Sequence, residues 1–166
     1  MGTNQSVNTV ALEFYEEKFN SILSDYDLSE KQIRFTSLPS EAMLSCEIDK
    51  TRHPVVILSG GEPVGFFVLH GWEGVKTYSD NRSAILVRAY SINVKFQGKG
   101  IAKKSLFILD SFVKSNFPGS NEIILAVNHQ NTVAQHLYKV SGFIDKGIRV
   151  MGRMGEQYIY HKELQI

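Results

Sequence analysis

The sequence has little cysteine, little excess charge and no long hydrophobic run. Its single cysteine, Cys46, cannot form an internal disulfide, and no Cys/His cluster has the spacing of a zinc site. A formal net charge of +1 lacks the basic excess of a general nucleic-acid binder. No stretch has the length of a membrane span, and the N-terminus lacks the pattern of a secretion signal. We therefore expect a cytoplasmic protein that binds no metal, nucleic acid or membrane, with Cys46 as a buried apolar residue.

What is present fits one folded domain. The chain has 166 residues, of which 43% are apolar and 21% charged, which is typical of a globular protein with a single core. We expect residues 1–9 to form a flexible tail and residues 10–166 to form a single domain.

The hydrophobic periodicity predicts strands and helices in mixed order. Helices are expected at residues 15–26, 28–35, 40–50, 101–116 and 132–141. Strands are expected at residues 10–14, in a hairpin within 54–72, and at 84–94, 122–127, 143–150 and 157–164. Gly65 predicts a bulge in the second hairpin arm, and residues 73–83 are expected to form a mobile surface loop. This order predicts an α/β fold on a mixed sheet.

The stretch FQGKGIAKKS, residues 96–105, predicts a glycine-rich turn between a strand and a helix. The first turn of a helix has unpaired backbone amides and a partial positive charge, so it is suited to bind phosphate. The spacing fits neither a Walker loop, because Lys99 is followed by Gly100, nor a dinucleotide loop, because Lys103 stands at the third glycine position. A phosphate ligand other than ATP or NAD remains open, beside the alternative of an ordinary turn.

Two distant segments together resemble the GNAT superfamily of acyl-CoA-dependent N-acetyltransferases. The first is the six-residue loop Gln97, Gly98, Lys99, Gly100, Ile101 and Ala102, which is similar to the family's pyrophosphate loop. The second comprises Asn131, the pair Leu137-Tyr138 and the pair Gly142-Phe143. The resemblance covers most of the chain from Pro54 to Leu164, and the N-terminal helices fit more loosely.

The resemblance implies a GNAT-like sheet that is mixed and mostly antiparallel, with about six to seven strands, splayed in the middle and flanked by about four helices. It implies acetyl-CoA as the co-substrate. The pantetheine arm would pair with the backbone near Ser91 and Ile92, and the diphosphate would bind the amides of residues 97–102. Asn131 and Asn128 would hydrogen-bond the pantetheine, although each could instead cap the following helix. Lys99, Lys103 or Lys104 could add attraction to the 3′-phosphate or be merely solvated.

The resemblance assigns Tyr138 as the proton donor to the departing sulfur; the alternative role is a packed core tyrosine. The sequence departs from the family at Ala126, where many members carry a glutamate base. Proton removal would then pass through water to Tyr90, Ser91, His129 or a carboxylate of the N-terminal helices.

The resemblance leaves several acceptors open. Residues 28–35 and 88–100 are similar to a bacterial branch that acetylates polyamines and other small amines, whereas Arg88 would favour an acceptor with a carboxylate. A protein N-terminus or lysine, or an acyl-CoA sensor without catalysis, are the alternatives. A homodimer through the terminal strands is possible. The candidate acceptor contacts are Glu30, Phe35, Glu41, Trp72, Tyr78, Arg88 and Glu156.

Overall fold

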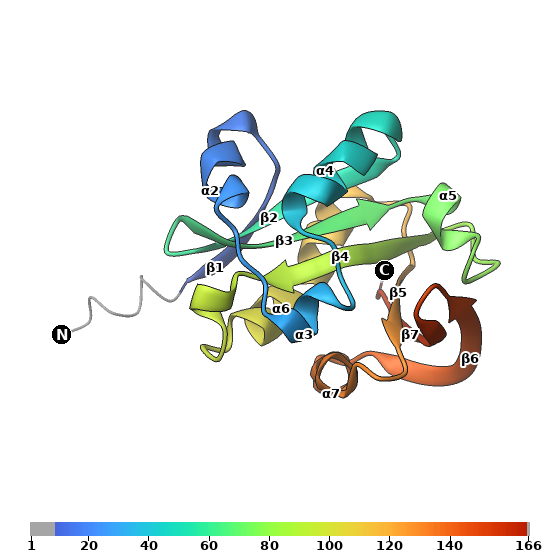
Figure 1. The fold of residues 1–166 in the computed structure, drawn as a ribbon. Helices are drawn as coiled ribbons and strands as arrows, with labels where there is room; N and C mark the ends of the chain where they lie inside the picture. The colour runs from blue at the N-terminus through green and yellow to red at the C-terminus, as the bar shows by residue number, and fades with distance from the viewer. Residues whose placement is uncertain (1–8, 166) are drawn as a thin grey trace.

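The computed structural model describes residues 9–165, so all but the last residue of the expected tail lies outside the described residues. One seven-stranded sheet runs through the molecule in the order β1-β2-β3-β4-β5-β7-β6 (Figure 1). The strands are β1 (Val10–Phe14), β2 (Arg52–Ser59), β3 (Glu62–His70), β4 (Ala84–Ile92), β5 (Glu122–Asn128), β6 (Ile144–Gly152) and β7 (Gly155–Glu163). The helices are α2 (Asn20–Ser24), α3 (Glu30–Ile33), α4 (Pro39–Ile48), α5 (Trp72–Val75), α6 (Ile101–Asn116) and α7 (Thr132–Val140), with 3₁₀ turns η1 (Glu17–Phe19) and η2 (Val94–Phe96).

The sheet is mixed, as the sequence predicts. Only β4 and β5 pair in parallel, and every other neighbouring pair is antiparallel. The parallel pairing extends from Ala84 opposite Glu122 to Val87 opposite Leu125 and then stops. Residues 88–92 of β4 and 126–128 of β5 therefore separate, which confirms the expected splay in the middle of the sheet.

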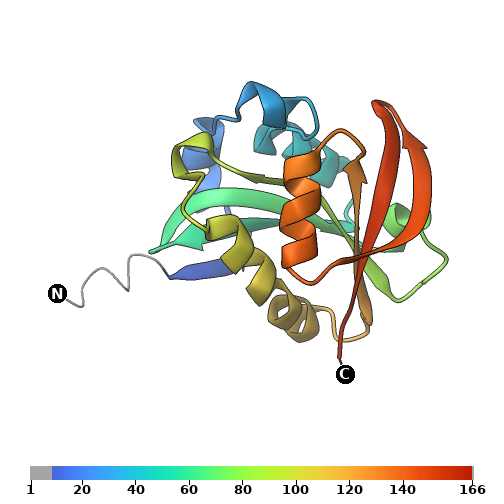
Figure 2. The same ribbon diagram turned by 90° about the horizontal axis from the view of Figure 1, so that it is seen from below.

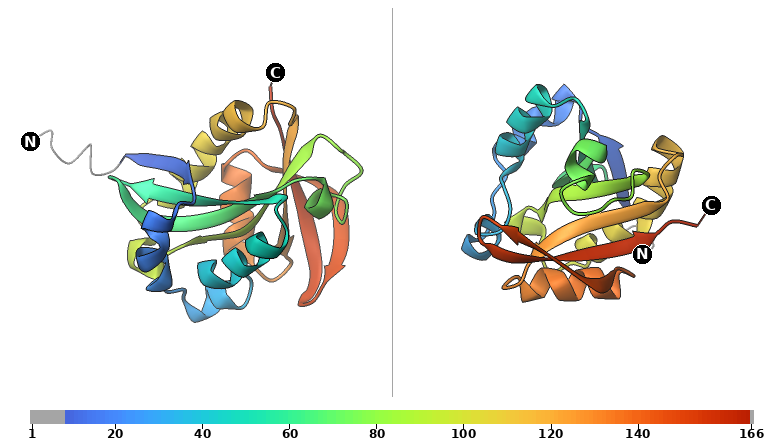
Figure 3. Two further views of the ribbon diagram at one scale, coloured as in Figure 1. Left: turned by 90° about the horizontal axis from the view of Figure 1, so that it is seen from above. Right: turned by 90° about the vertical axis from the view of Figure 1, so that its right-hand side faces the viewer.

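Side chains that alternate along β2 and β3 place a core on each face of the sheet. Val55 and Ile57 pack with α6 and α7, whereas Val56 and Leu58 pack with the N-terminal helices. Helices α2 and α4 lie over one face, and α6 and α7 lie over the other (Figures 2 and 3). Cys46 is a buried member of the second core, as expected. No helix within residues 9–165 is long and apolar enough to cross a membrane.

Three local expectations need correction or refinement. Residues 15–26 do not form one helix: the chain is extended at Glu16 before η1 and α2. Residues 73–83 are not only a surface loop, because they include most of α5, whose Val75 is buried. The bulge predicted at Gly65 lies beside it: the β2–β3 register shifts between Ile57 and Leu58.

Candidate active site

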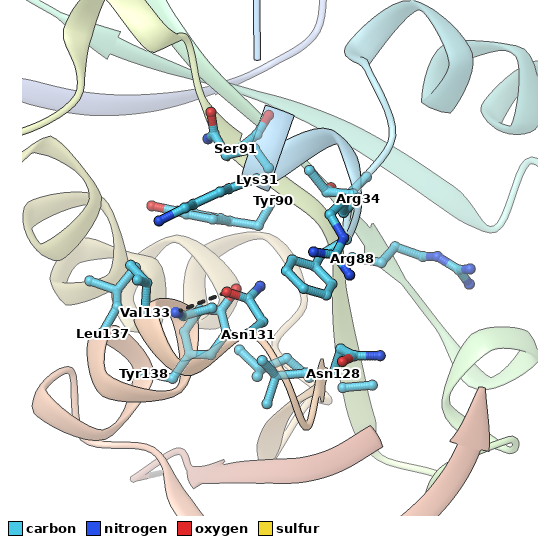
Figure 4. A pocket seen from close by; sticks show the side chains of 18 of the residues that line it. Lys31, Arg34, Arg88, Tyr90, Ser91, Asn128, Asn131, Val133, Leu137 and Tyr138 are labelled. Atoms are coloured by element: carbon cyan, nitrogen blue, oxygen red, sulfur yellow. Dashed lines mark hydrogen bonds between the residues drawn. The ribbon is translucent and has the colours of Figure 1, made fainter. Parts of the chain in front are cut away.

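A cavity of about 1530 Å³ opens where β4 and β5 separate (Figure 4). Its walls come from β4, β5, the N-terminus of α6 and one side of α7. Ser29 and residues 31–37, before α4, and residues 150–154, at the β6–β7 turn, line it further. Segments that are distant in the sequence therefore surround one space of the size of a substrate site.

A bulge in β4 shapes one wall of this cavity. The β3–β4 register shifts between Phe66 and Val68, so that Ala89 and Tyr90 together face Phe67. Ala89 has φ of 55°, and it is the one residue other than glycine with a positive φ in the described part of the chain. A bulge bends its strand and redirects the side chains that follow. The free half of β4 thus turns away from β5.

The loop before α6 presents backbone amides to the cavity. Gly98 and Gly100 have φ of 76° and 77°, a left-handed conformation that glycine adopts without strain. A Cβ at either residue would meet no atom within 4 Å, so conformation, rather than crowding within the protein, favours glycine here. Among residues 9–165, the amides of residues 98–103 have no acceptor in the protein. These amides lie at the positive end of a 16-residue helix, a position that is suited to phosphate oxygens.

Gln97 and Ile92 hold each other in place. The Gln97 side chain donates a hydrogen bond to the Ile92 carbonyl at 2.9 Å and another to the Gln32 side chain. Gln32 also donates to the Ile92 carbonyl, at 3.2 Å. The Gln97 amide itself donates to the Val94 carbonyl. In this arrangement Gln97 braces the loop, and pairing of the Ile92 carbonyl with pantetheine would require these side chains to move.

Ser91 is buried, and its hydroxyl lies 2.9 Å from the hydroxyl of Tyr26. The Ser91 side chain therefore ties β4 to the N-terminal segment. Its expected role, pairing of its backbone with pantetheine, stays a prediction.

The two asparagines predicted to bind pantetheine differ in whether a side-chain atom remains available for a ligand. Asn131 caps α7: its Oδ1 accepts a hydrogen bond from the Ala134 amide at 3.3 Å, and its Nδ2 has no acceptor among the described residues (Figure 4). Asn128 is engaged at both ends, since its Nδ2 donates to the Met154 carbonyl and its Oδ1 accepts from the Gln130 amide. Asn131 can therefore cap and donate to a ligand at once, whereas Asn128 fastens β5 to the β6–β7 turn.

Tyr138 lies on the inner side of α7 and lines both the core and the cavity. Its ring packs edge-on against Tyr90, Phe143 and Tyr160, with centroids 6.4, 6.0 and 6.3 Å away. Burial raises the pKa of Tyr138 well above that of a free phenol. Its hydroxyl is not among the buried polar atoms without a partner. Tyr138 thus keeps its proton at neutral pH and meets the cavity.

Most groups expected to take up a proton are engaged or absent from the cavity. Ala126 lines it, so no carboxylate stands on β5 there. The Tyr90 hydroxyl bonds to Ser105 and to the Ala102 carbonyl, which holds it against α6. His129 does not line the cavity. Within the described lining, Glu41 is the one Asp or Glu side chain.

The candidate acceptor contacts divide into two groups. Phe35, Glu41, Tyr78 and Arg88 line the cavity. Glu30 and Glu156 do not, and Trp72 lines a second, smaller cavity of about 690 Å³. Sequence reasoning missed three cationic residues of the wall, namely Lys31, Arg34 and Arg153, because nothing in their local pattern distinguishes them from solvated surface residues.

A splayed mixed sheet, a helix N-terminus with free amides and a buried tyrosine beside the gap together define an acyl-CoA-dependent acyltransferase. The chain belongs to the GNAT acetyltransferase family, whose family model matches residues 20–143. It is 45% identical over 153 residues to the uncharacterized N-acetyltransferase YbbJ of Bacillus subtilis (strain 168), covering 92% of this chain and 96% of that protein. The chain is thus an acetyl-CoA-dependent N-acetyltransferase.

Two solved structures show the same fold at low sequence identity. The aminoglycoside acetyltransferase AAC(6')-Ib in complex with coenzyme A aligns with a TM-score of 0.74 at 17% identity, over 93% of this chain and 95% of that chain. Spermidine N-acetyltransferase from Vibrio cholerae, in complex with CoA and spermine, aligns with a TM-score of 0.68 at 16% identity, over 93% and 95%.

Proposed function

We propose that the protein transfers the acetyl group of acetyl-CoA to the primary amine of a small molecule, by direct attack in a ternary complex. The observation that carries this proposal is the arrangement of Tyr138 on one wall of the splayed cavity and the free amides of residues 98–103 on another.

The residues present fit coenzyme A. Residues 98–103 offer amides to the diphosphate, and Lys103 in the cavity lining adds a positive charge. The gap between β4 and β5 leaves room for the extended pantetheine arm, beside the free Nδ2 of Asn131. A ligand strand can pair with open backbone groups as in β-augmentation.

In this reaction the acceptor ammonium loses two protons and the departing sulfur gains one. The neutral amine forms a bond to the thioester carbonyl carbon, the carbon–sulfur bond breaks, and coenzyme A leaves as a thiol. Tyr138 supplies the proton to sulfur, because it lines the cavity and its phenol is protonated at neutral pH. Before the attack, the acceptor ammonium loses one proton to Glu41 through water, since Glu41 is the carboxylate in the described cavity wall. After the attack, the nitrogen loses a second proton, which restores the Tyr138 phenol.

The shape of the site supports a small acceptor. Residues 31–37 and residues 150–154 both line the cavity, which suits a compact molecule better than an extended peptide. By their names, the two solved structures above act on an aminoglycoside and on spermidine, which supports an amine acceptor without specifying it.

The test is a panel of small amines, amino acids and peptides, with thiol release from acetyl-CoA as the readout. Turnover of small amines with little turnover of peptides supports the proposal. Preferential turnover of peptides would make the protein a peptide acetyltransferase. Tight acetyl-CoA binding without turnover of any amine would make it a sensor.

A further inference from the structure

Lys and Arg side chains outnumber carboxylates in the wall of the cavity between β4 and β5. Among the described residues that line it, the Lys and Arg side chains are Lys31, Arg34, Arg88, Lys103 and Arg153, and Glu41 is the one carboxylate. Lys103 lies in the first turn of α6, where the diphosphate is proposed to bind. The remaining four come from other walls of the same cavity. Such a wall opposes a polycationic acceptor and favours one that carries negative charge.

Arg88 is the member of this set that the fold holds in place. It follows Val87, the last residue of β4 that pairs with β5, and lies on the cavity wall at the splay (Figure 4). No ion pair joins it to an acidic side chain within the described residues. Its one side-chain hydrogen bond there runs from NH1 to Nδ1 of His70, at 3.1 Å. Its other nitrogens are not among the buried atoms without a partner, so they meet solvent.

His70 is positioned to orient the guanidinium without neutralising it. The ring is 2% exposed, and its Nε2 lies 2.9 Å from Oδ2 of Asp49 and 3.1 Å from the Thr51 hydroxyl. Because a guanidinium only donates, Nδ1 must accept, and Nε2 therefore carries the proton and donates to Asp49. Burial, and to a smaller extent the nearby Arg52 and Arg88, lower the pKa of His70, so the ring is neutral at neutral pH.

Gly74 completes this support. A Cβ on Gly74 would lie 2.3 Å from Nδ1 of His70, so only glycine lets α5 cover the ring this closely. Asp49 at the end of α4, His70 on β3 and Gly74 in α5 thus come from three elements and fix one arginine. Because its partner His70 is neutral, the positive charge of the Arg88 guanidinium is not compensated and can attract a negatively charged ligand.

We infer that Arg88 binds a carboxylate of the acceptor, so that the substrate is a small amine that also carries a carboxylate, such as an amino acid, rather than a polyamine. This inference rests on the proposed function, and it adds His70 as the positioning residue for Arg88. The planar guanidinium fork matches the two carboxylate oxygens.

The experiment compares paired compounds that differ only in the carboxylate: lysine with cadaverine, ornithine with putrescine, and phenylalanine with phenethylamine. We expect kcat/KM for the carboxylated member to exceed that of its partner by about 10- to 100-fold, the range for hydrogen bonds to charged groups. Arg88→Gln should remove this preference by raising KM for the carboxylated amine, with KM for acetyl-CoA unchanged. Arg88→Lys should keep part of it, and His70→Gln should weaken it in the same direction.

Arg52→Gln is the matched control. Arg52 lies 3.5 Å from the Asp49 carboxylate in the same cluster but does not line the cavity, so its loss should leave the preference intact. Equal turnover of paired compounds by the wild-type protein needs no variant and would overturn the inference, as would an equal loss for both members in Arg88→Gln.

Two outcomes separate this inference from the proposed function. Rapid turnover of polyamines with none of the carboxylated amines would keep the function and overturn the inference. If no amine is acetylated, binding is tested instead, by the melting temperature of the wild type and of Arg88→Gln with coenzyme A and each compound. Stabilisation by the carboxylated member in the wild type but not in Arg88→Gln supports the inference while the function fails, and no difference within the pairs overturns it.

Discussion

Tyr138 belongs to the core and to the cavity at once. Its aromatic contacts fix the ring, and the burial that produces them also raises the pKa of the phenol. A packing role and a catalytic role therefore do not exclude each other at this residue. The experiment that separates them must remove the hydroxyl and keep the ring.

Tyr138→Phe is expected to lower kcat by about 100-fold or more, as for loss of a general acid, with KM for acetyl-CoA changed less than about threefold. The aromatic contacts persist, so the melting temperature should stay near that of the wild type. Steady-state kinetics of thiol release and thermal unfolding measure both. An equal loss of turnover and acetyl-CoA binding would reduce Tyr138 to a structural residue.

Glu41→Gln is expected to lower kcat about tenfold or more at neutral pH, because an amide cannot accept a proton. The defect should shrink at a pH above the pKa of the acceptor amine, where the base is no longer needed. Glu30→Gln serves as the control, since Glu30 carries the same charge nearby but does not line the cavity. A pH-independent defect, or none, would rule out Glu41 as the base.

At the scale of elements, the long periodic segments were predictable, and so were the short elements β1 and α3, whereas α5 was not. The helix at residues 101–116 and the hairpin around Gly60 and Gly61 occur as expected, because apolar period and turn residues agree there. A helix of a single turn has too few residues to show a hydrophobic periodicity in the sequence. Val75 illustrates this: its burial in a third apolar cluster with Leu86 and Ile124 orders α5 through contacts that no local pattern contains.

Asn131 caps helix α7 and is also proposed to bind pantetheine, and two substitutions can separate these roles. Asn131→Ser keeps an oxygen acceptor for the Ala134 amide, so stability should change little while KM for acetyl-CoA rises. Asn131→Ala should raise KM similarly and also lower the free energy of unfolding by about 1 kcal/mol. Urea unfolding and acetyl-CoA kinetics on both variants measure this. If serine restores acetyl-CoA binding as well as stability, Nδ2 does not contact the ligand.

At the scale of the whole molecule, the loop and helix motifs at residues 97–102 and 131–143 were visible in the sequence, whereas the group around Arg88 was not. His70 lies 18 residues before Arg88 and 21 residues after Asp49. The pairing of β3 with β4 brings it to Arg88, and the pairing of β3 with β2 brings it to Asp49. The choice of a candidate strand for dimerisation also depends on the fold. Ile159 and Tyr160 are fully buried within the protein's own core, so β6, at the edge of the sheet, is the terminal strand open to pairing. A homodimer through β6 stays a prediction.

Two buried histidines make stability depend on pH. Burial lowers the pKa of His70 and of His161, so the unfolded chain binds protons that the folded protein does not. Stability should therefore be complete above about pH 6.5, the ordinary histidine value, and fall as pH drops below it. Hydrogen bonds from Thr51 hold the pKa of Asp49 far below its usual range, so its contribution persists until much stronger acid.

The melting temperature of the wild type between pH 5 and pH 7.5 measures this dependence. His70→Asn and His161→Asn should each flatten it, and replacement of the exposed His136 should not. A melting temperature that rises on acidification would contradict the account.

A crystal structure with coenzyme A bound tests the central claim most directly. The account predicts the diphosphate on the amides of residues 98–103, the pantetheine between β4 and β5, and the thiol within hydrogen-bond reach of the Tyr138 hydroxyl. A diphosphate bound elsewhere, or a Tyr138 hydroxyl directed away from the sulfur, would contradict it.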